Sequence, residues 1–130
     1  MHWLDATLIE QFARDGAVRI PSPFSAQQMA GLEAGIDLNL ARLSPRAKIA
    51  SAPTDPGRFV EDFCNWQENP HYHRFIFESA LAATAGRLMQ SKTARLYHDH
   101  MLTKEPGTRQ PTPSAAGVSS DITPPFGCAV

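Results

Sequence analysis

The chain has few cysteines, no long apolar run and no excess of charge of either sign. Cys64 and Cys128 form neither a CxxC pair nor a zinc-finger spacing, so we interpret them as reduced thiols. No apolar stretch approaches the roughly 20 residues of a membrane-spanning helix, and the first residues lack the basic-then-apolar pattern of a secretory signal. The net charge of -1 favours neither nucleic acid nor an anionic membrane as a partner. These absences predict a soluble, cytoplasmic protein.

The residues that are present predict one modest α+β domain. Of the 130 residues, 42% are hydrophobic and 19% are charged, as is usual for a globular chain. A first helix is expected between a cap at Asp5 and Gly16, followed by a short strand at 17–21. Ser25 is the expected cap of a second helix at 26–43. A proline-rich loop at 44–57 then leads to an alternating strand at 58–63.

The second half of the chain is expected to hold two more helices and the longest strand. Asn69 followed by Pro70 is typical of a helix start. A helix of small residues should end near Ser91, and TARLYHDHMLTKE, residues 93–105, is predicted to be a strand. We place the domain at 1–107. The remaining segment, 108–130, is rich in proline, serine and glycine and is predicted to be a disordered tail.

Five apolar residues of the second predicted helix recur at helical spacing and are expected to face the core. They are Met29, Leu32, Ile36, Leu40 and Leu43.

The most suggestive chemistry lies at His98, Asp99 and His100, which are consecutive. Successive side chains of a strand point to opposite faces, so the two histidines should share one face and Asp99 should point away. The three residues therefore should not hold one metal ion together, and no third ligand is evident elsewhere. On the same alternation, Lys104 lies on the side of the two histidines, and by itself it reads as a surface lysine.

The sequence also lacks several common catalytic and binding motifs. There is no glycine-rich phosphate loop, no GxSxG motif and no paired-carboxylate motif. Glu61 and Asp62 are adjacent in the predicted strand and should face opposite sides. Cys64 has no basic neighbour in sequence that would lower its pKa and activate it.

Three segments, in this order, resemble the N-terminal part of the phytanoyl-CoA dioxygenase family. FARDGAVRIP, residues 12–21, is similar to the opening helix, Asp-Gly turn and short strand of that family. The helix at 26–43 follows, and residues 66–113 resemble the helical stretch and first long barrel strand. The likeness covers nearly all of residues 8–113.

The resemblance implies the first helices and strands of a double-stranded β-helix, or jelly roll, with the barrel incomplete. It also implies Fe(II), held by two histidines and one carboxylate, 2-oxoglutarate as co-substrate, and a small organic substrate that is hydroxylated. Lys104 matches a family lysine that can contact the 2-oxoglutarate carboxylate, which suits its charge. The oligomeric state stays open.

The sequence departs from the family after Pro113. In the family, an aromatic residue and a His-x-Asp pair that binds iron follow at this point, whereas here the next residues are Ser114, Ala115, Ala116 and Gly117. We therefore expect a truncated family member that binds neither cofactor and has no catalytic or metal-ligating residue of its own. The alternatives are a non-catalytic binding or regulatory module, and a residual enzyme that uses His98, His100 and an unidentified ligand.

Overall fold

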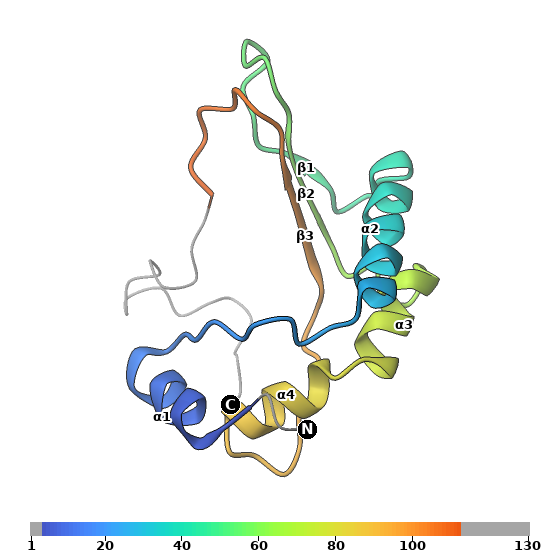
Figure 1. Cartoon of the computed structure of the whole chain (residues 1–130). Helices are drawn as coiled ribbons and strands as arrows, with labels where there is room; N and C mark the ends of the chain where they lie inside the picture. Colours follow the sequence, from blue (N-terminus) through green and yellow to red (C-terminus); the bar gives the residue numbers. More distant parts are fainter. Residues whose placement is uncertain (1–3, 113–130) are drawn as a thin grey trace.

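The computed structural model describes residues 4–112 and has an α+β architecture (Figure 1). Four helices lie to one side of, and below, a small antiparallel sheet in that view. The α+β class predicted from the sequence is confirmed. The elements, in chain order, are α1 (Ala6–Asp15), α2 (Ala26–Ala41), β1 (Lys48–Ile49), β2 (Phe59–Phe63), α3 (Pro70–Glu78), α4 (Leu81–Leu88) and β3 (His100–Lys104).

Local capping signals fix the starts of three helices. The Asp5 carboxylate accepts a hydrogen bond from the Leu8 amide at the start of α1, and Ser25 forms a reciprocal capping box with Gln28 at the start of α2. Asn69 accepts from the first amides of α3. Each side chain pairs backbone groups that the helix itself leaves unsatisfied. Gly16 ends α1 with a φ of 71°, the left-handed conformation that glycine adopts readily.

The sheet has the order β1-β2-β3, and both pairs of strands are antiparallel. Phe59 pairs with Lys104 and Phe63 pairs with His100, so the register assigns every side chain to one of two sides. The helix side carries Val60, Asp62, Met101 and Thr103. The open side carries Phe59, Glu61, Phe63, His100, Leu102 and Lys104.

Helices α2 and α3 pack closely because α2 has a glycine at their crossing. A Cβ atom at Gly35 would lie 2.8 Å from the Cβ of His71 and 3.0 Å from the ring of Tyr72. The Asn69 side chain also donates to the Gly35 carbonyl at 2.9 Å. The pair α2 and α3 is thereby held on the helix side of the sheet, while α1 and α4 lie together below it (Figure 1).

The hydrophobic core is small. Within residues 4–112 the buried hydrophobic side chains are Leu4, Phe59, Val60, Tyr72 and Met101. The predicted core stripe of α2 is only partly right, because Met29 is 48% exposed and Leu43 is 36% exposed. The fully buried positions of α2 are Gly35 and Asn39. Gly35 lies against α3, and Asn39 is hydrogen-bonded to Asp62 of β2, whereas the ends of the apolar stripe stay uncovered.

Three strand predictions need correction. Residues 17–21, predicted as a strand, are instead part of the irregular connection between α1 and α2. The predicted strand at 93–105 is shortened to β3, because β2 offers pairing partners only from Phe63 back to Phe59. The predicted loop at 44–57 contains β1, whose two residues pair with Glu61 and Val60. In each case a partner strand decides the outcome, whereas the residue pattern does not contain that information.

Helix boundaries differ by smaller amounts. The second helix ends at Ala41 and not at residue 43, and α4 ends at Leu88, short of Ser91. None of the helices in the described part of the chain has the length and hydrophobicity that a membrane span requires. Most of the predicted tail, residues 113–130, lies outside the described residues.

Candidate functional site on the open side of the sheet

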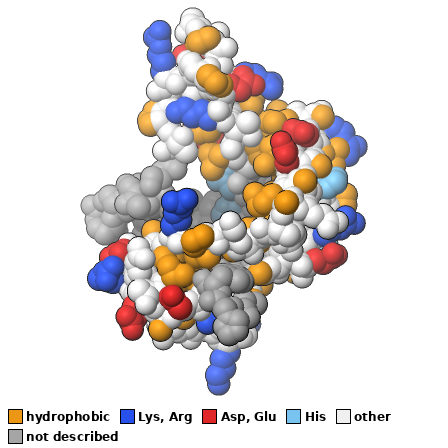
Figure 2. Space-filling view, viewed as in Figure 1, with side chains coloured by type: hydrophobic (Ala, Val, Ile, Leu, Met, Phe, Trp, Pro, Cys, Tyr) orange, Lys and Arg blue, Asp and Glu red, His pale blue; other side chains and the backbone are white. Residues whose placement is uncertain are grey.

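The open side of β2 and β3 brings together the residues that the sequence singled out. His100 and Lys104 stand at the two ends of β3 and share a side because they are four positions apart. Their partners across the ladder are Phe63 and Phe59. Figure 2 shows a central hollow with hydrophobic groups at its rim and histidine within it.

His100 is the centre of one polar cluster on this side. Its ring stacks on Phe63 at 4.1 Å between centroids, and its Nε2 lies 3.8 Å from the Glu61 carboxylate. Partial burial lowers the pKa of His100 below 6.5, although Glu61 acts in the opposite direction. The imidazole is therefore largely neutral near pH 7 and can accept or donate a hydrogen bond.

Lys104 lies at the other end of the open side and is exposed. Its ammonium donates to the Gln110 carbonyl at 2.6 Å and lies 5.8 Å from the centre of the Phe59 ring. Lys48 makes a similar contact with the Phe63 ring at 5.8 Å. Two cations thus flank the open side, and the one at Lys104 can turn from a backbone carbonyl to an anionic ligand.

The three consecutive residues of the sequence motif, His98, Asp99 and His100, make different contacts in the structure. His98 precedes β3 and is exposed. The Asp99 carboxylate accepts the backbone amides of Asn65 at 3.0 Å and Trp66 at 3.1 Å, so it holds the turn after β2. The alternation predicted for the three residues does not apply, because β3 begins at His100, and all three line one pocket. Across residues 4–112, no group of three His, Cys, Asp or Glu side chains could hold a metal ion.

The helix side of the sheet uses its polar residues differently. Asp62 is fully buried, and its carboxylate accepts hydrogen bonds from the Asn39 side chain at 2.8 Å and from the Ser44 amide at 2.8 Å. The Ser44 hydroxyl donates to the other carboxylate oxygen. Asn39 in turn accepts from the Tyr72 hydroxyl at 3.1 Å. This network joins α2, β2 and α3, and we call it the Asp62 network.

Burial and hydrogen bonding act in opposite directions on the Asp62 network. Burial alone raises the pKa of Asp62, but the hydrogen bonds from Ser44, Asn65 and Asn39 outweigh it and hold that pKa well below its ordinary value of 3.8. Burial, together with the charges of Asp99 and Asp62, raises the pKa of Tyr72 to about 12. Both groups thus keep a single protonation state over the ordinary pH range, as structural groups do.

Arg46 completes the structural framework around the turn after β2. Its guanidinium donates to the carbonyls of Phe63 and Cys64, and to the Asn65 side chain. Cys64 itself is exposed and has a φ of 56°, which is strained for a residue other than glycine. Contacts at both of its peptide groups, including its amide to the Asp99 carbonyl at 3.0 Å, hold this conformation.

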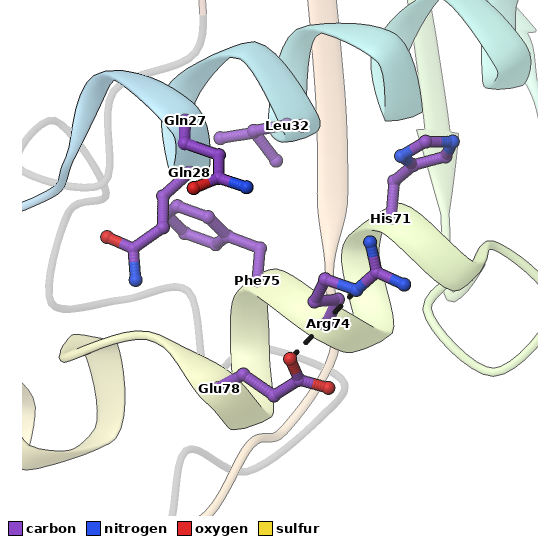
Figure 3. Close-up of a pocket in the computed structure, with 8 residues that line it drawn as sticks. Gln27, Gln28, Leu32, His71, Arg74, Phe75 and Glu78 are labelled. Carbon is purple, nitrogen blue, oxygen red and sulfur yellow. Dashed lines mark ion pairs between the residues drawn. The ribbon is translucent and has the colours of Figure 1, made fainter.

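A smaller hollow of about 250 Å³ lies between α2 and α3 on the outer surface (Figure 3). Gln27, Gln28 and Leu32 approach it from α2, and His71, Arg74, Phe75 and Glu78 approach it from α3. Arg74 and Glu78 face each other at 3.9 Å, one helical turn apart. Their opposite charges largely cancel, so this hollow offers little net charge to attract a ligand.

The Asp62 network was not predicted from the sequence, since its members lie between 5 and 33 positions apart along the chain. Two polar residues could have indicated the network, because they stand where the repeat pattern predicts apolar side chains. They are Asn39 in the second helix and Asp62 in the strand. The placement of Glu61 and Asp62 on opposite sides of the sheet was predicted and is confirmed by their partners.

Comparison with protein-family models, with curated proteins and with solved structures finds no match to this chain.

Proposed function

We propose that residues 8–113 are the N-terminal part of a phytanoyl-CoA dioxygenase-like fold, and that the open side of the sheet is its ligand-binding side. The observation that supports this best is the contrast between the sheet's two sides. Helices α2 and α3 cover one side, while the other carries exposed His100, Leu102 and Lys104. A jelly roll needs such a sheet, with helices outside and a ligand-facing inner surface.

Within this proposal, Lys104 contacts a carboxylate of 2-oxoglutarate. Its ammonium is exposed and anchored only to the Gln110 carbonyl and, more loosely, to the Phe59 ring. A carboxylate can replace the carbonyl with a stronger, charge-assisted hydrogen bond. The small organic substrate of the family would lie on the same side.

Iron does not fit the described residues. The side chains of Asp99 and His100 are occupied by the turn after β2 and by Phe63 with Glu61, and residues 4–112 hold no group of three ligands. We therefore assign no hydroxylation step to this part of the chain. The function proposed for it is to bind the carboxylate ligand and not to oxidise a substrate.

Titration of the full chain with 2-oxoglutarate, followed by NMR of the backbone amides, tests the proposal. One lysine contact predicts weak binding, with a Kd on the order of 1 mM, and shifts centred on β3. Lys104→Met should weaken binding roughly tenfold, which corresponds to about 1.4 kcal/mol, while Lys92→Met, at another exposed lysine, should not change it. Shifts spread over the whole surface, or equal losses in both variants, would contradict the assignment.

A non-catalytic binding module is the second candidate, and the free edge of β3 favours it. In the described part of the chain β3 is an outer strand, and Leu96, Tyr97 and Leu102 beside it are 41%, 52% and 41% exposed. Such an edge can pair with a strand of another chain. Leu102→Lys should then abolish capture of a partner chain in a pull-down, while binding of 2-oxoglutarate at Lys104 would not require that edge.

A further inference from the structure

A mainly apolar pocket of the described residues lies between the helices and β3, and its lining includes His100, Met101 and Leu102 of that strand. Its volume is about 440 Å³, within the range of roughly 300–1,000 Å³ that is usual for small-molecule sites. Helices α2, α3 and α4 and the segment before β3 form its walls. The apolar lining includes Leu32, Ile36, Phe75, Ile76, Leu81 and Leu96, and we call it the edge pocket.

Three polar residues line the edge pocket near the start of β3, namely His98, Asp99 and His100. The Asp99 carboxylate is held by hydrogen bonds from two backbone amides, so a carboxylate stands at this end of the pocket. His98 has its ring edge-on to Tyr97 at 4.9 Å, and its ring nitrogens can serve as hydrogen-bond partners. No lysine or arginine lines the pocket.

This charge pattern selects among ligands. A carboxylate or phosphate would enter an apolar space that is lined by one carboxylate and by no lysine or arginine, and both conditions oppose it. An uncharged molecule with one hydroxyl group would bury its apolar part against leucine, isoleucine and phenylalanine. Its hydroxyl could form a hydrogen bond with His98 and would leave no buried charge.

We propose that the edge pocket binds a small, uncharged, mainly apolar molecule that carries a single hydroxyl group. This inference does not rest on the contact proposed for Lys104, because Lys104 does not line the pocket, although His100 and Leu102 belong both to the pocket and to the open side. It is also independent of pairing at the free edge of β3, although a chain docked there would compete for Leu96 and Leu102.

In the test, the whole 130-residue protein is titrated with three ligands that share the same apolar tail. Below their micelle concentrations, n-decanol, decanoate and n-decylammonium are titrated, and NOEs to the methyl groups of Leu32, Ile36 and Ile76 locate each ligand. We expect saturable binding of n-decanol with these NOEs, and binding of decanoate weaker by about tenfold or more, as a buried like charge requires.

Two matched leucine variants test the position of the pocket. Leu96 is 41% exposed in a segment without regular structure, so Leu96→Trp should fold and fill the pocket. It should weaken n-decanol binding at least about tenfold, a loss that excluding most of the ligand's apolar surface predicts. Leu43→Trp alters a leucine of similar exposure, 36%, that does not line the pocket. It should change binding by less than about twofold, as a distant surface site does.

Four results would overturn the proposal. They are the absence of saturable n-decanol binding, equal binding of decanoate, tighter binding of n-decylammonium, and equal effects of the two leucine variants. The third result would make Asp99 the counter-ion of a cationic ligand. The fourth would place the alcohol on another surface of the protein.

Discussion

The two sides of the small sheet use the same kinds of residue for different purposes. On the helix side, Asp62 is fully buried and hydrogen-bonded to Asn39 and Ser44. On the open side, Glu61 lies 3.8 Å from His100, and Lys104 is exposed to solvent. Adjacent carboxylates in one strand thus have different roles, because the alternation of the strand gives them different surroundings. The helix side holds a buried hydrogen-bond network, whereas the open side keeps His100, Leu102 and Lys104 exposed.

The largest expected effect on stability comes from disrupting the Asp62 network on the helix side of the sheet. Asp62→Ala leaves the Asn39 amide, the Ser44 amide and the Ser44 hydroxyl without their shared acceptor. Buried donors without partners are costly, so the free energy of unfolding should fall by about 3 kcal/mol or more. Urea denaturation measures this loss.

Glu61, the neighbour of Asp62 on the open side, provides the matched control. Glu61→Gln should change the free energy of unfolding by less than about 1 kcal/mol, because its contact with His100 is long and partly exposed. If Glu61→Gln destabilised the protein as much as Asp62→Ala, the two sides of the sheet would not differ as we describe.

The second effect sharpens the comparison within α2, the helix that covers the sheet. Gly35→Ala places a Cβ atom 2.8 Å from that of His71, and the overpacking should cost about 1–3 kcal/mol of stability. Gly31→Ala, one turn earlier, meets nothing within 4 Å and should gain up to about 1 kcal/mol from helix propensity. Opposite shifts in Tm are expected, and a loss at both positions would show that the close approach of α2 and α3 is not the cause.

The smallest effect is a pH dependence on the open side. Burial, opposed by Glu61, lowers the pKa of His100 in the folded state below 6.5, while the charges of His98 and Lys48 lower it further and Asp99 raises it. The unfolded chain therefore binds more protons than the folded chain just below pH 6.5, so stability should rise with pH through this window.

Urea denaturation between pH 5 and about 7.5 measures that rise, since this range covers ordinary histidine titration. His100→Gln should make the rise shallower, whereas His73→Gln, at an exposed position on α3, should leave the contribution of His100 in place. An unchanged slope in His100→Gln would show that His100 is not held neutral by its surroundings. Asp62 contributes a separate loss of stability only below about pH 3.8, because its pKa is lowered.

Much of the local structure was predictable from the sequence, because its causes lie within a few residues. Asp5, Ser25 and Asn69 cap helices through contacts at most three positions away. The strand at 58–63 was recognised from its alternation, and the same alternation placed His100 and Lys104 on one side. The proposed relationship to phytanoyl-CoA dioxygenases stays a prediction, as does the role of Lys104.

The sequence alone determined where α1, α2 and α3 begin, which residues alternate across β2 and β3, and that Glu61 and Asp62 face opposite ways. These features follow from backbone geometry and nearby hydrogen bonds. Only the tertiary structure decided that residues 17–21 remain irregular, that β1 forms, and that β3 begins at His100, because each outcome depends on a strand partner distant in sequence. The tertiary structure also decided which partners the polar residues have. Asp62 is hydrogen-bonded to Asn39, 23 positions away, and Asp99 to the turn after β2, whereas Lys104 and Lys48 remain exposed cations beside the ladder.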